Sequence, residues 1–461
     1  MGGRYCVRFG IAITETHWEQ LLNWLKTRNE TAGVLTARIG TGTESTTFLV
    51  RSLTEVPHQS YVDRRPDFLS IRSTGYVPAL RMAANDSAVG IFVHSHPSGD
   101  ARHSELDDVV DAQIAGVFQY RTRQSYFLSM VLAGSVEAPT FTARVYLDRQ
   151  LVGFVESVRI VGSRIRVVSS AIADQVPDLL FDRQVRAFGA QGQALLRRMR
   201  IGVVGAGGTG SAVAEQLVRL GVGEIVLVDD DRVEDTNVTR IHEATIRDVG
   251  QYKVEVLAAR AKEIGTGTHV TAIRARLNEP SILRPLADCD VVFGCTDDVT
   301  GRSILARFAY WYLVPVFDMG FIIDSREGHI RGLFGRITTL VPGAPCLVCR
   351  GRISPESIYY EALAPRERRD RIAEGYAPEL AEPAPAVIPY TTVVASLAVS
   401  EFLSRLFSLS ESPPNELLLR VLDRVLSRPT TDGRPGHFCI APHYWGLGDQ
   451  TPPLGQMWTS E

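Results

Sequence analysis

The sequence has no excess of either charge and no long apolar run, and each absence excludes a class of protein. Its 461 residues contain 49 Lys plus Arg and 52 Asp plus Glu, giving a net charge of −3. Without a basic excess, we expect no binding to nucleic acid or to an anionic membrane. The most apolar stretch, residues 387–407, contains Pro389, Glu401 and Arg405 and is too polar to span a bilayer. Residues 1–20 lack the apolar core of a secretory signal, and we expect a cytoplasmic protein.

Cysteine is also scarce, with six residues scattered along the chain, which excludes a disulfide framework. The length predicts two or three domains of about 150 residues, each with a core of its own. We find no internal repeat. The patterns predict a first domain over 1–150 and a second over 179–461. Between them, residues 151–178 are expected to form a connector hairpin or linker, or else the last strands of the first domain.

The first domain has the mixed pattern of an α+β fold. Helices are expected over 16–28 and 105–116, and strands over 32–37, 46–51, 88–94, 126–132 and 143–148. From residue 200 onward, strands and helices alternate. Strands are expected over 200–204, 224–229, 291–295 and 314–319, and helices over 211–220 and 253–264. This alternation predicts an α/β, doubly wound, Rossmann-like parallel sheet with its ligand at the carboxyl ends of the strands. Residues 361–389, which are charged and then rich in Ala and Pro, are expected to form a mobile excursion outside that sheet.

A metal-binding pattern lies in the first domain. His94 and His96 end a strand and project to the same side, and Asp107 begins the next helix. Three such ligands suit zinc and leave one position for a water whose pKa the metal lowers to about 7. Glu30 is a candidate general acid/base, and Ser104 a candidate donor to the oxyanion. We expect the intervening Asp100 and His103 to be ordinary loop residues.

The order Glu30, His94-Ser95-His96-Pro97, then Ser104 and Asp107, resembles the JAMM (JAB/MPN+) metalloproteases. That resemblance implies that His94, His96 and Asp107 bind a catalytic zinc, that Glu30 moves protons and that Ser104 stabilises the oxyanion. It also implies cleavage of a peptide or isopeptide bond after the C-terminal glycine of a ubiquitin-like protein.

A glycine loop follows the strand 200–204 at the entry to a helix. Gly205, Gly207 and Gly210 satisfy Gly-x-Gly-x-x-Gly, with Gly208 between them, and Asp229 is placed to hold a ribose. This loop fits a dinucleotide-binding dehydrogenase and an adenylating enzyme equally well.

The residues after the loop favour adenylation. Arg240 and Lys253 supply two cations, and Asp297 supplies a carboxylate at the end of a strand. Splitting ATP at the α-phosphate requires such cations and a carboxylate that holds magnesium, whereas hydride transfer does not.

This set resembles the MoeB/ThiF/ubiquitin-activating superfamily. The resemblance implies phosphate approach at Gly205, Gly207, Gly208 and Gly210, and ribose binding by Asp229. It implies phosphate binding by Asn237, Arg240 and Lys253, and magnesium binding by Asp297. Asp298 stands where the superfamily usually has Asn. The segment 181–184 resembles one whose arginine, here Arg183, reaches into the partner subunit's site, which implies a homodimer.

Cys346 and Cys349 form a Cys-x-x-Cys pair that resembles half of the superfamily's structural zinc site. The tail offers Cys439 and His443, with His437 nearby, and we expect Cys346, Cys349, Cys439 and His443 to be the four ligands. The alternative is two unrelated pairs of buried side chains.

Together the two patterns predict an enzyme that cleaves after the C-terminal glycine of a ubiquitin-like protein and also adenylates that terminus with ATP. The partner would end in Gly-Gly. Two alternatives remain: activation of a sulfur-carrier protein without conjugation, and a non-catalytic scaffold. Conjugation requires a conjugating-enzyme partner and a thioester, yet no cysteine lies between Arg350 and Phe438. That gap favours sulfur transfer.

Overall fold

The structure is a computed structural model that describes residues 7–97, 99–170, 179–364, 366, 367, 369, 370, 385–451 and 453. The chain divides into two compact units. Among the described residues, the first unit comprises 7–170, 311–313 and 442–451, and the second comprises the remainder. None of the helices in these residues is long and apolar enough to cross a membrane.

The first unit is built on an eight-stranded mixed sheet in the order β1-β3-β2-β6-β7-β8-β9-β10. Because β1 also pairs with β9, seven of these strands close into a ring. Its elements are β1 (Arg8–Thr14), α1 (Glu15–Trp24), β2 (Ala32–Thr41), β3 (Ser45–Glu55), η1 (His58–Ser60), β4 (Tyr61–Arg65), β5 (Phe68–Ile71), η2 (Ser73–Gly75), α2 (Val77–Asn85), β6 (Val89–His96), α3 (Glu105–Thr122), β7 (Tyr126–Gly134), β8 (Pro139–Leu147), β9 (Gln150–Val161), β10 (Ile165–Ser169), η7 (Pro442–Tyr444) and η8 (Gly448–Gln450).

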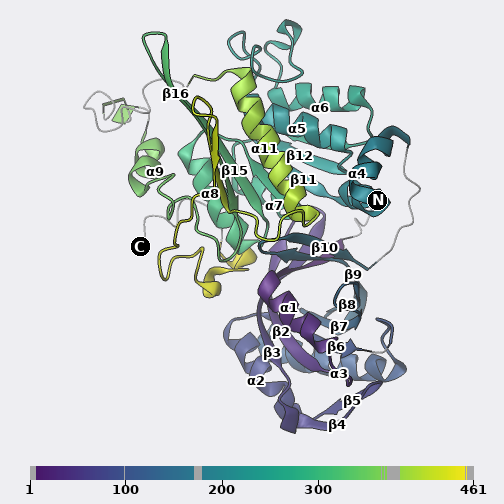
Figure 1. Cartoon of the computed structure of the whole chain (residues 1–461). Coiled ribbons are helices and arrows are strands. Elements are labelled where there is room, and N and C mark those ends of the chain that lie inside the picture. The colour runs from purple at the N-terminus through teal and green to yellow at the C-terminus, as the bar shows by residue number, and fades with distance from the viewer. Residues whose placement is uncertain are drawn as a thin grey trace, which may run out of the picture. The chain divides into compact units, whose positions relative to one another are not determined.

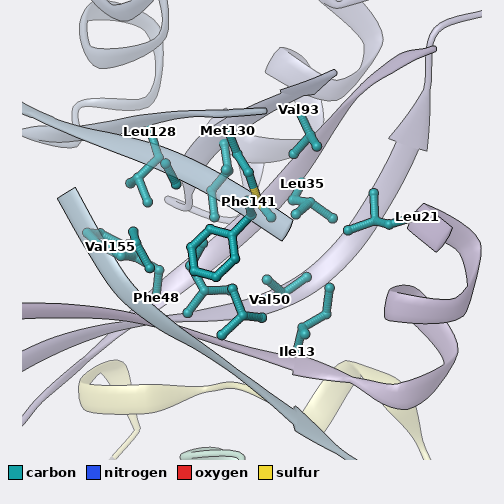
Figure 2. Packing of buried hydrophobic residues seen from close by; sticks show 14 of the residues in the cluster. Ile13, Leu21, Leu35, Phe48, Val50, Val93, Leu128, Met130, Phe141 and Val155 are labelled. Atoms are coloured by element: carbon teal, nitrogen blue, oxygen red, sulfur yellow. The ribbon is translucent and has the colours of Figure 1, made fainter. Parts of the chain in front are cut away.

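Two apolar clusters hold this unit together. Figure 2 shows the larger one, in which Leu35, Phe48, Met130 and Phe141 converge from different strands of the ring and Leu21 enters from α1. Burying aliphatic and aromatic side chains supplies most of the stabilisation of such a core. The smaller cluster includes Leu80 of α2 and Phe118 of α3, packed with Phe92 of β6.

Strands β9 and β10, within the expected connector segment 151–178, belong to the sheet of the first unit. β9 pairs with β8 and with β1, and β10 pairs with β9. Residues 151–169 of this segment thus lie in the first sheet, and residues 171–178 lie outside the described residues.

Residues 442–451, which fall within the expected second domain of 179–461, belong to the first compact unit. Asp449 Oδ2 accepts a hydrogen bond from Thr41 N at 3.0 Å, and Arg51 donates to the carbonyl of Trp445 at 2.6 Å. The hydroxyl of Tyr312 donates to Asp449 Oδ1 at 3.0 Å. These bonds satisfy polar groups along β2 and β3, so residues 442–451 and 311–313 complete that side of the first unit.

The second unit contains another eight-stranded sheet, in the order β13-β12-β11-β14-β15-β16-β17-β18. Its elements are η3 (Leu179–Phe181), α4 (Asp182–Arg198), β11 (Arg200–Val204), α5 (Gly208–Leu220), β12 (Glu224–Val228), η4 (Ile246–Asp248), α6 (Lys253–Ile264), β13 (His269–Ile273), η5 (Pro280–Ile282), α7 (Leu283–Ala287), β14 (Val291–Gly294), α8 (Val299–Trp311), β15 (Val316–Arg326), β16 (His329–Leu340), α9 (Pro355–Ala362), α11 (Ile388–Leu406), β17 (Glu416–Arg420) and β18 (Val425–Ser427).

Strands β11 to β15 are parallel, and the strands after β15 are antiparallel. The chain leaves β11 toward β12 on one side and later returns to β14 on the other, which makes the space between β11 and β14 the topological switch point. Ligands bind at such a point, beyond the carboxyl ends of the strands. Helices α5, α6 and α11 lie on the same face of this sheet (Figure 1). Most of the excursion expected over 361–389 lies outside the described residues, and its last residues begin α11.

Candidate metal and nucleotide sites

The three expected zinc ligands of the first unit converge. The two histidine side chains leave the end of β6 on the same side, and their Nε2 atoms lie 3.1 Å apart. His94 Nε2 lies 3.7 Å from Asp107 Oδ1. Nitrogen and oxygen ligands about 2.0–2.2 Å from a tetrahedral zinc stand roughly 3.3–3.6 Å from one another. The donor set of His94, His96 and Asp107 therefore fits zinc with little rearrangement.

The first turn of α3 positions Asp107. Ser104 is the N-cap residue, and its Oγ accepts a hydrogen bond from Asp107 N. In return, Ser104 N and Ser104 Oγ donate to Asp107 Oδ2 at 2.7 and 2.8 Å. This capping box leaves Asp107 Oδ1 on the side of His94. Because the hydroxyl proton of Ser104 is directed at Asp107, the oxyanion role requires the hydroxyl to rotate, and that role stays a prediction.

The histidines are held in the form that binds a metal. His96 Nδ1 lies 2.9 Å from the carbonyl oxygen of Asp100, which can accept the ring proton and so leave Nε2 free. Burial lowers the pKa of His94, so its imidazole is neutral at neutral pH. Neutral imidazole is the species that ligates zinc.

Glu30 lies beside this group. Its side chain is buried, and Oε1 lies 3.6 Å from His96 Nε2. Burial, reinforced by the carboxylates of Asp107 and Asp67, raises the pKa of Glu30 to about 8. A carboxyl group that can hold a proton near neutral pH is suited to general acid/base work.

His103 is not the ordinary loop residue that we expected. Its side chain is buried, and its Nε2 lies 3.3 Å from the Ser129 carbonyl and 3.9 Å from Asp111 Oδ2. Asp111 also accepts a hydrogen bond from Arg144 at 3.3 Å, and burial raises the pKa of Asp111 to about 6. Helical spacing could have revealed Asp111, because it lies one turn after Asp107 on the same face of α3. His103 itself carried no such signal.

A second group of possible metal ligands lies in the other unit and contains Cys346, Cys349, His437 and Cys439. Cys349 Sγ lies 3.7 Å from Cys439 Sγ, and Cys346 Sγ lies 3.6 Å from His437 Nδ1. Two sulfurs bound at 2.3 Å to a tetrahedral zinc are about 3.8 Å apart. Hydrogen bonds from Cys439 and His437 lower the pKa of the Cys346 thiol, which favours the thiolate that a metal requires. The donor set fits a structural zinc.

His437 takes the place that we expected for His443. The amides of Ile440 and Ala441 both donate to the His437 carbonyl, so the chain turns tightly at this point and brings His437 together with Cys439. His443 lies further along in η7, with its side chain exposed and its carbonyl accepting a hydrogen bond from Arg51. Among the described residues, the structure therefore groups His437, and not His443, with the three cysteines. The motif His-x-Cys, with the same spacing as His94-x-His96, was the signal that could have indicated His437.

Ion pairs attach the loop that carries Cys346 and Cys349 to the sheet. Arg352 donates to both carboxylate oxygens of Glu416 at 2.9 and 3.0 Å, and Arg350 donates to the same group at 3.3 Å. Glu416 is fully buried at the start of β17. Two arginines thus compensate one buried carboxylate and fix the direction of the cysteine loop.

The glycine loop connects β11 with α5, as expected. Gly205 has a φ of +95°, a conformation that side chains rarely adopt, and Gly207 is the N-cap residue of α5. A Cβ at Gly210 would lie 1.7 Å from the Gly205 carbonyl oxygen, so a side chain cannot fit there. The loop therefore holds backbone N–H groups and a helix N-terminus at the switch point, where they can bind phosphate.

Asp229 supports this loop directly. One carboxylate oxygen accepts a hydrogen bond from Ala206 N at 2.6 Å, and the other accepts from Asp231 N at 2.8 Å. Burial raises the pKa of Asp229, and Lys253 and these two donors oppose that rise. The carboxylate thus joins the end of β12 to the loop, whereas its expected contact with ribose stays a prediction.

Three of the expected phosphate-binding residues lie on the segment after β12. Asn237 is buried, and its Oδ1 accepts a hydrogen bond from Glu234 N. Arg240 donates to the Thr236 carbonyl, and its own carbonyl lies 3.1 Å from where a Cβ of Gly208 would be. Lys253 begins α6 and donates to Asp231 Oδ2 at 2.7 Å. The backbone of Arg240 therefore lies beside the start of α5, directly after the glycine loop. Lys253 pairs with Asp231, which lies two residues after Asp229.

The remaining expected residues follow β14 or begin α4. Asp297 is exposed just beyond the end of β14, beside the strand that leads into the loop. Asp298 instead accepts a hydrogen bond from Gly301 N and so caps α8. This capping role explains how Asp can stand where Asn is usual, because both residues cap helices well. Arg183 lies exposed in the first turn of α4.

Two family models match the chain, one in each of its two units. Residues 181–424, more than half of the chain, match the ThiF family, and residues 15–146 match prokaryotic homologues of the JAB domain. The SAMP-activating enzyme E1 of Haloferax volcanii is 34% identical over 168 residues, covering 36% of this chain and 59% of that protein. The molybdopterin-synthase adenylyltransferase of Escherichia coli is 32% identical over 181 residues, covering 39% and 70% of the respective chains.

Among solved structures, Escherichia coli MccB with ATP has a TM-score of 0.46 at 17% identity, covering 59% of this chain and 76% of that one. The chain spans about three-fifths of the first of the two curated relatives. The first of these relatives activates SAMP, and the second is an adenylyltransferase. Because the ThiF model matches more than half of its residues, the chain belongs to the ThiF family, and it carries a JAB-like domain in its N-terminal part.

Proposed function

We propose that the chain acts on the C-terminal tail of a ubiquitin-like or sulfur-carrier protein with two activities, adenylation in the second unit and zinc-dependent hydrolysis in the first. The observation that carries the hydrolytic half is the convergence of His94, His96 and Asp107 with Glu30 beside them. The adenylation half is supported by membership of the ThiF family and by relatives that activate SAMP and the sulfur carrier ThiS.

In the hydrolase site, His94, His96 and Asp107 would hold a zinc ion, which supplies a Lewis acid and an activated water when bound. Glu30 takes a proton from the attacking water and delivers it to the leaving amine. Because Glu30 is buried and close to His96, it is oriented toward the reacting position and away from bulk solvent. The bond broken is the amide that follows the C-terminal glycine of the partner.

In the second unit, the carboxylate of the partner's terminal glycine attacks the α-phosphorus of ATP, and pyrophosphate leaves. The glycine loop and the N-terminus of α5 bind phosphate oxygens through backbone N–H groups. Arg240 and Lys253 neutralise charge that develops on the splitting phosphates. Asp297, exposed beyond β14, would hold magnesium.

The cysteines favour sulfur transfer over conjugation. Cys439 lies in the proposed zinc group, and burial raises the pKa of Cys289 and of Cys295, so none of the three is an available nucleophile. The acyl-adenylate is therefore best captured by an external sulfur donor. A conjugating-enzyme partner would require a thioester that the described cysteines do not offer.

The adenylation half is tested by ATP–pyrophosphate exchange. The probe is a purified ThiS-type sulfur carrier that ends in Gly-Gly, and exchange should depend on it. Asp297→Ala should abolish exchange, and Asp298→Asn, which preserves the helix cap, should retain it. Exchange that is unaffected by Asp297→Ala would remove the magnesium assignment.

The hydrolytic half is tested with the same carrier fused, after its Gly-Gly, to a short peptide. Wild-type protein should release the peptide, which mass spectrometry detects as a carrier shortened to the terminal glycine. Glu30→Gln should retain zinc and lose cleavage. Cleavage by Glu30→Gln at the wild-type rate would show that Glu30 moves no essential proton.

A further inference from the structure

A small hairpin lies next to Glu30. It consists of β4 and β5, which pair with one another to form a separate two-stranded sheet. Tyr61, Leu69 and Ile71 attach the base of this hairpin to the smaller apolar cluster of the first unit. Its strand β4 also contacts residues 30–32, where the chain enters β2.

The hairpin supplies both backbone partners of Glu30. Glu30 N donates to the Arg65 carbonyl at 2.9 Å, and the Glu30 carbonyl accepts from Arg64 Nε at 2.7 Å. Glu30 precedes β2 and therefore has no ladder partner from the main sheet. Its backbone is instead placed by two consecutive residues of β4.

Two more hydrogen bonds extend this contact to the residues that follow. Arg64 Nη2 donates to Thr31 Oγ1 at 2.5 Å, and Ala32 N donates to the Tyr61 hydroxyl at 3.0 Å. The guanidinium of Arg64 also lies over the Tyr61 ring, 4.7 Å from its centroid. The planar guanidinium presents Nε–H and Nη2–H in a fixed geometry, so its two hydrogen bonds set the positions of Glu30 and Thr31 together, whereas the three donors of an ammonium group rotate freely.

We propose that the β4–β5 hairpin is a positioning element for Glu30, with Arg64 as the residue that fixes the Glu30 carboxylate within reach of the paired histidines. This inference rests on the hydrolytic role proposed for Glu30. A proton-transfer group works only within hydrogen-bonding reach of its target, and a misplacement of about 1 Å can lower a rate roughly 100-fold. Loosening the hairpin should therefore lower turnover although every metal ligand remains.

The test uses full-length, zinc-loaded protein and four variants. Arg64→Ala removes both side-chain bonds, Arg64→Lys can restore one of them, and Tyr61→Phe removes only the hydroxyl while keeping the packed ring. Arg65→Ala is the matched control, because its exposed side chain pairs with Asp63 and only its backbone contacts Glu30.

Two measurements are made on each variant. The first is kcat and KM for cleavage of the carrier–peptide fusion, together with bound zinc. The second is hydrogen exchange of the Glu30 and Ala32 amides, which requires no activity. For Arg64→Ala we expect kcat to fall about 10- to 100-fold with KM and zinc content unchanged, and faster exchange. Arg64→Lys should lie between Arg64→Ala and wild type, and Arg65→Ala should match wild type.

Three results would overturn the inference. One is a kcat for Arg64→Ala equal to that of Arg65→Ala, and another is a loss of zinc that accounts for the lower rate. The third is unchanged amide exchange in both Arg64→Ala and Tyr61→Phe. If wild-type protein fails to cleave the fusion, the proposed hydrolytic function fails, and the exchange rates alone decide whether the hairpin positions Glu30.

Discussion

Thr31 and Ser95 hold one another through two reciprocal hydrogen bonds, 64 residues apart in the sequence. Thr31 N donates to Ser95 Oγ at 3.0 Å, and Ser95 N donates to the Thr31 carbonyl at 2.9 Å. Thr31 follows Glu30, and Ser95 lies between the two histidines. One buried pair thus joins the candidate proton-transfer group to the candidate metal ligands.

Removing the Ser95 hydroxyl should therefore affect both stability and turnover. In Ser95→Ala the Thr31 amide stays buried without its acceptor, which costs about 1–3 kcal/mol in the free energy of unfolding. We expect a loss of that size in chemical denaturation, and a lower kcat with zinc retained. Ser52→Ala is the control, since its hydroxyl pairs with Thr36 on β2 and not with residues 30 or 31. Equal effects of the two substitutions would contradict the role of Ser95.

The sequence predicted the parts of the sites that are encoded by local spacing. Two histidines on alternate strand positions must point to the same side, and a glycine loop between a strand and a helix must present backbone N–H groups. The strands 200–204, 224–229 and 291–295 were therefore found nearly to the residue, since fully buried parallel strands read as short apolar runs.

Contacts that depend on tertiary structure were missed. Arg64 and Tyr61 belong to a hairpin whose approach to Glu30 no periodicity reveals. The sequence points to His443 because a Cys-x-x-x-His pair, here Cys439 and His443, can bind zinc tetrahedrally. Only the backbone turn over 437–441, which no spacing reveals, brings His437 to Cys439. Helix α1 was expected to reach residue 28 but ends at Trp24, where the following amides close a tight turn onto the last helical carbonyls.

The choice between His437 and His443 can be settled by counting zinc. If both metal groups are filled, wild-type protein binds two zinc ions per chain, and His437→Ala should lose one of them and unfold at a lower temperature. His443→Ala should retain both. Elemental analysis of the purified proteins checks this, with His94→Ala as a reference that loses the zinc of the first unit. Zinc loss in His443→Ala but not in His437→Ala would reverse the assignment.

Asp111 should make the stability of the first unit depend on pH. Its pKa is about 6 in the folded chain, because of burial, against about 4 in an unfolded chain. The folded state therefore binds the proton more tightly, and this contribution to stability is complete below about pH 4 and is lost as the pH rises through 6.

Asparagine does not ionise, so Asp111→Asn should not lose stability as the pH rises through 6. Between pH 4 and 7 the free energy of unfolding of Asp111→Asn should rise relative to wild type, by about 3 kcal/mol at most. Denaturation measured at several pH values checks the sign and the range. Asp108→Asn is the control, because Asp108 pairs with the same Arg144 yet is mostly exposed. A difference between Asp111→Asn and wild type that does not change with pH would show that Asp111 is ionised throughout.

Arg183 provides a test of whether two copies of the chain share a nucleotide site. It is exposed in the first turn of α4, which leaves it available to another subunit. Arg183→Ala and Asp297→Ala should each abolish ATP–pyrophosphate exchange. In a mixed dimer, the subunit with intact Asp297 receives Arg183 from its partner, so one of the two sites is complete. Random assembly makes half of the dimers mixed, so about a quarter of wild-type exchange should return on mixing after dissociation.

The control is Arg186, a nearby arginine that pairs with Asp182. The variant Arg186→Ala should retain exchange without any mixing. If mixing restores no exchange, Arg183 does not act across subunits.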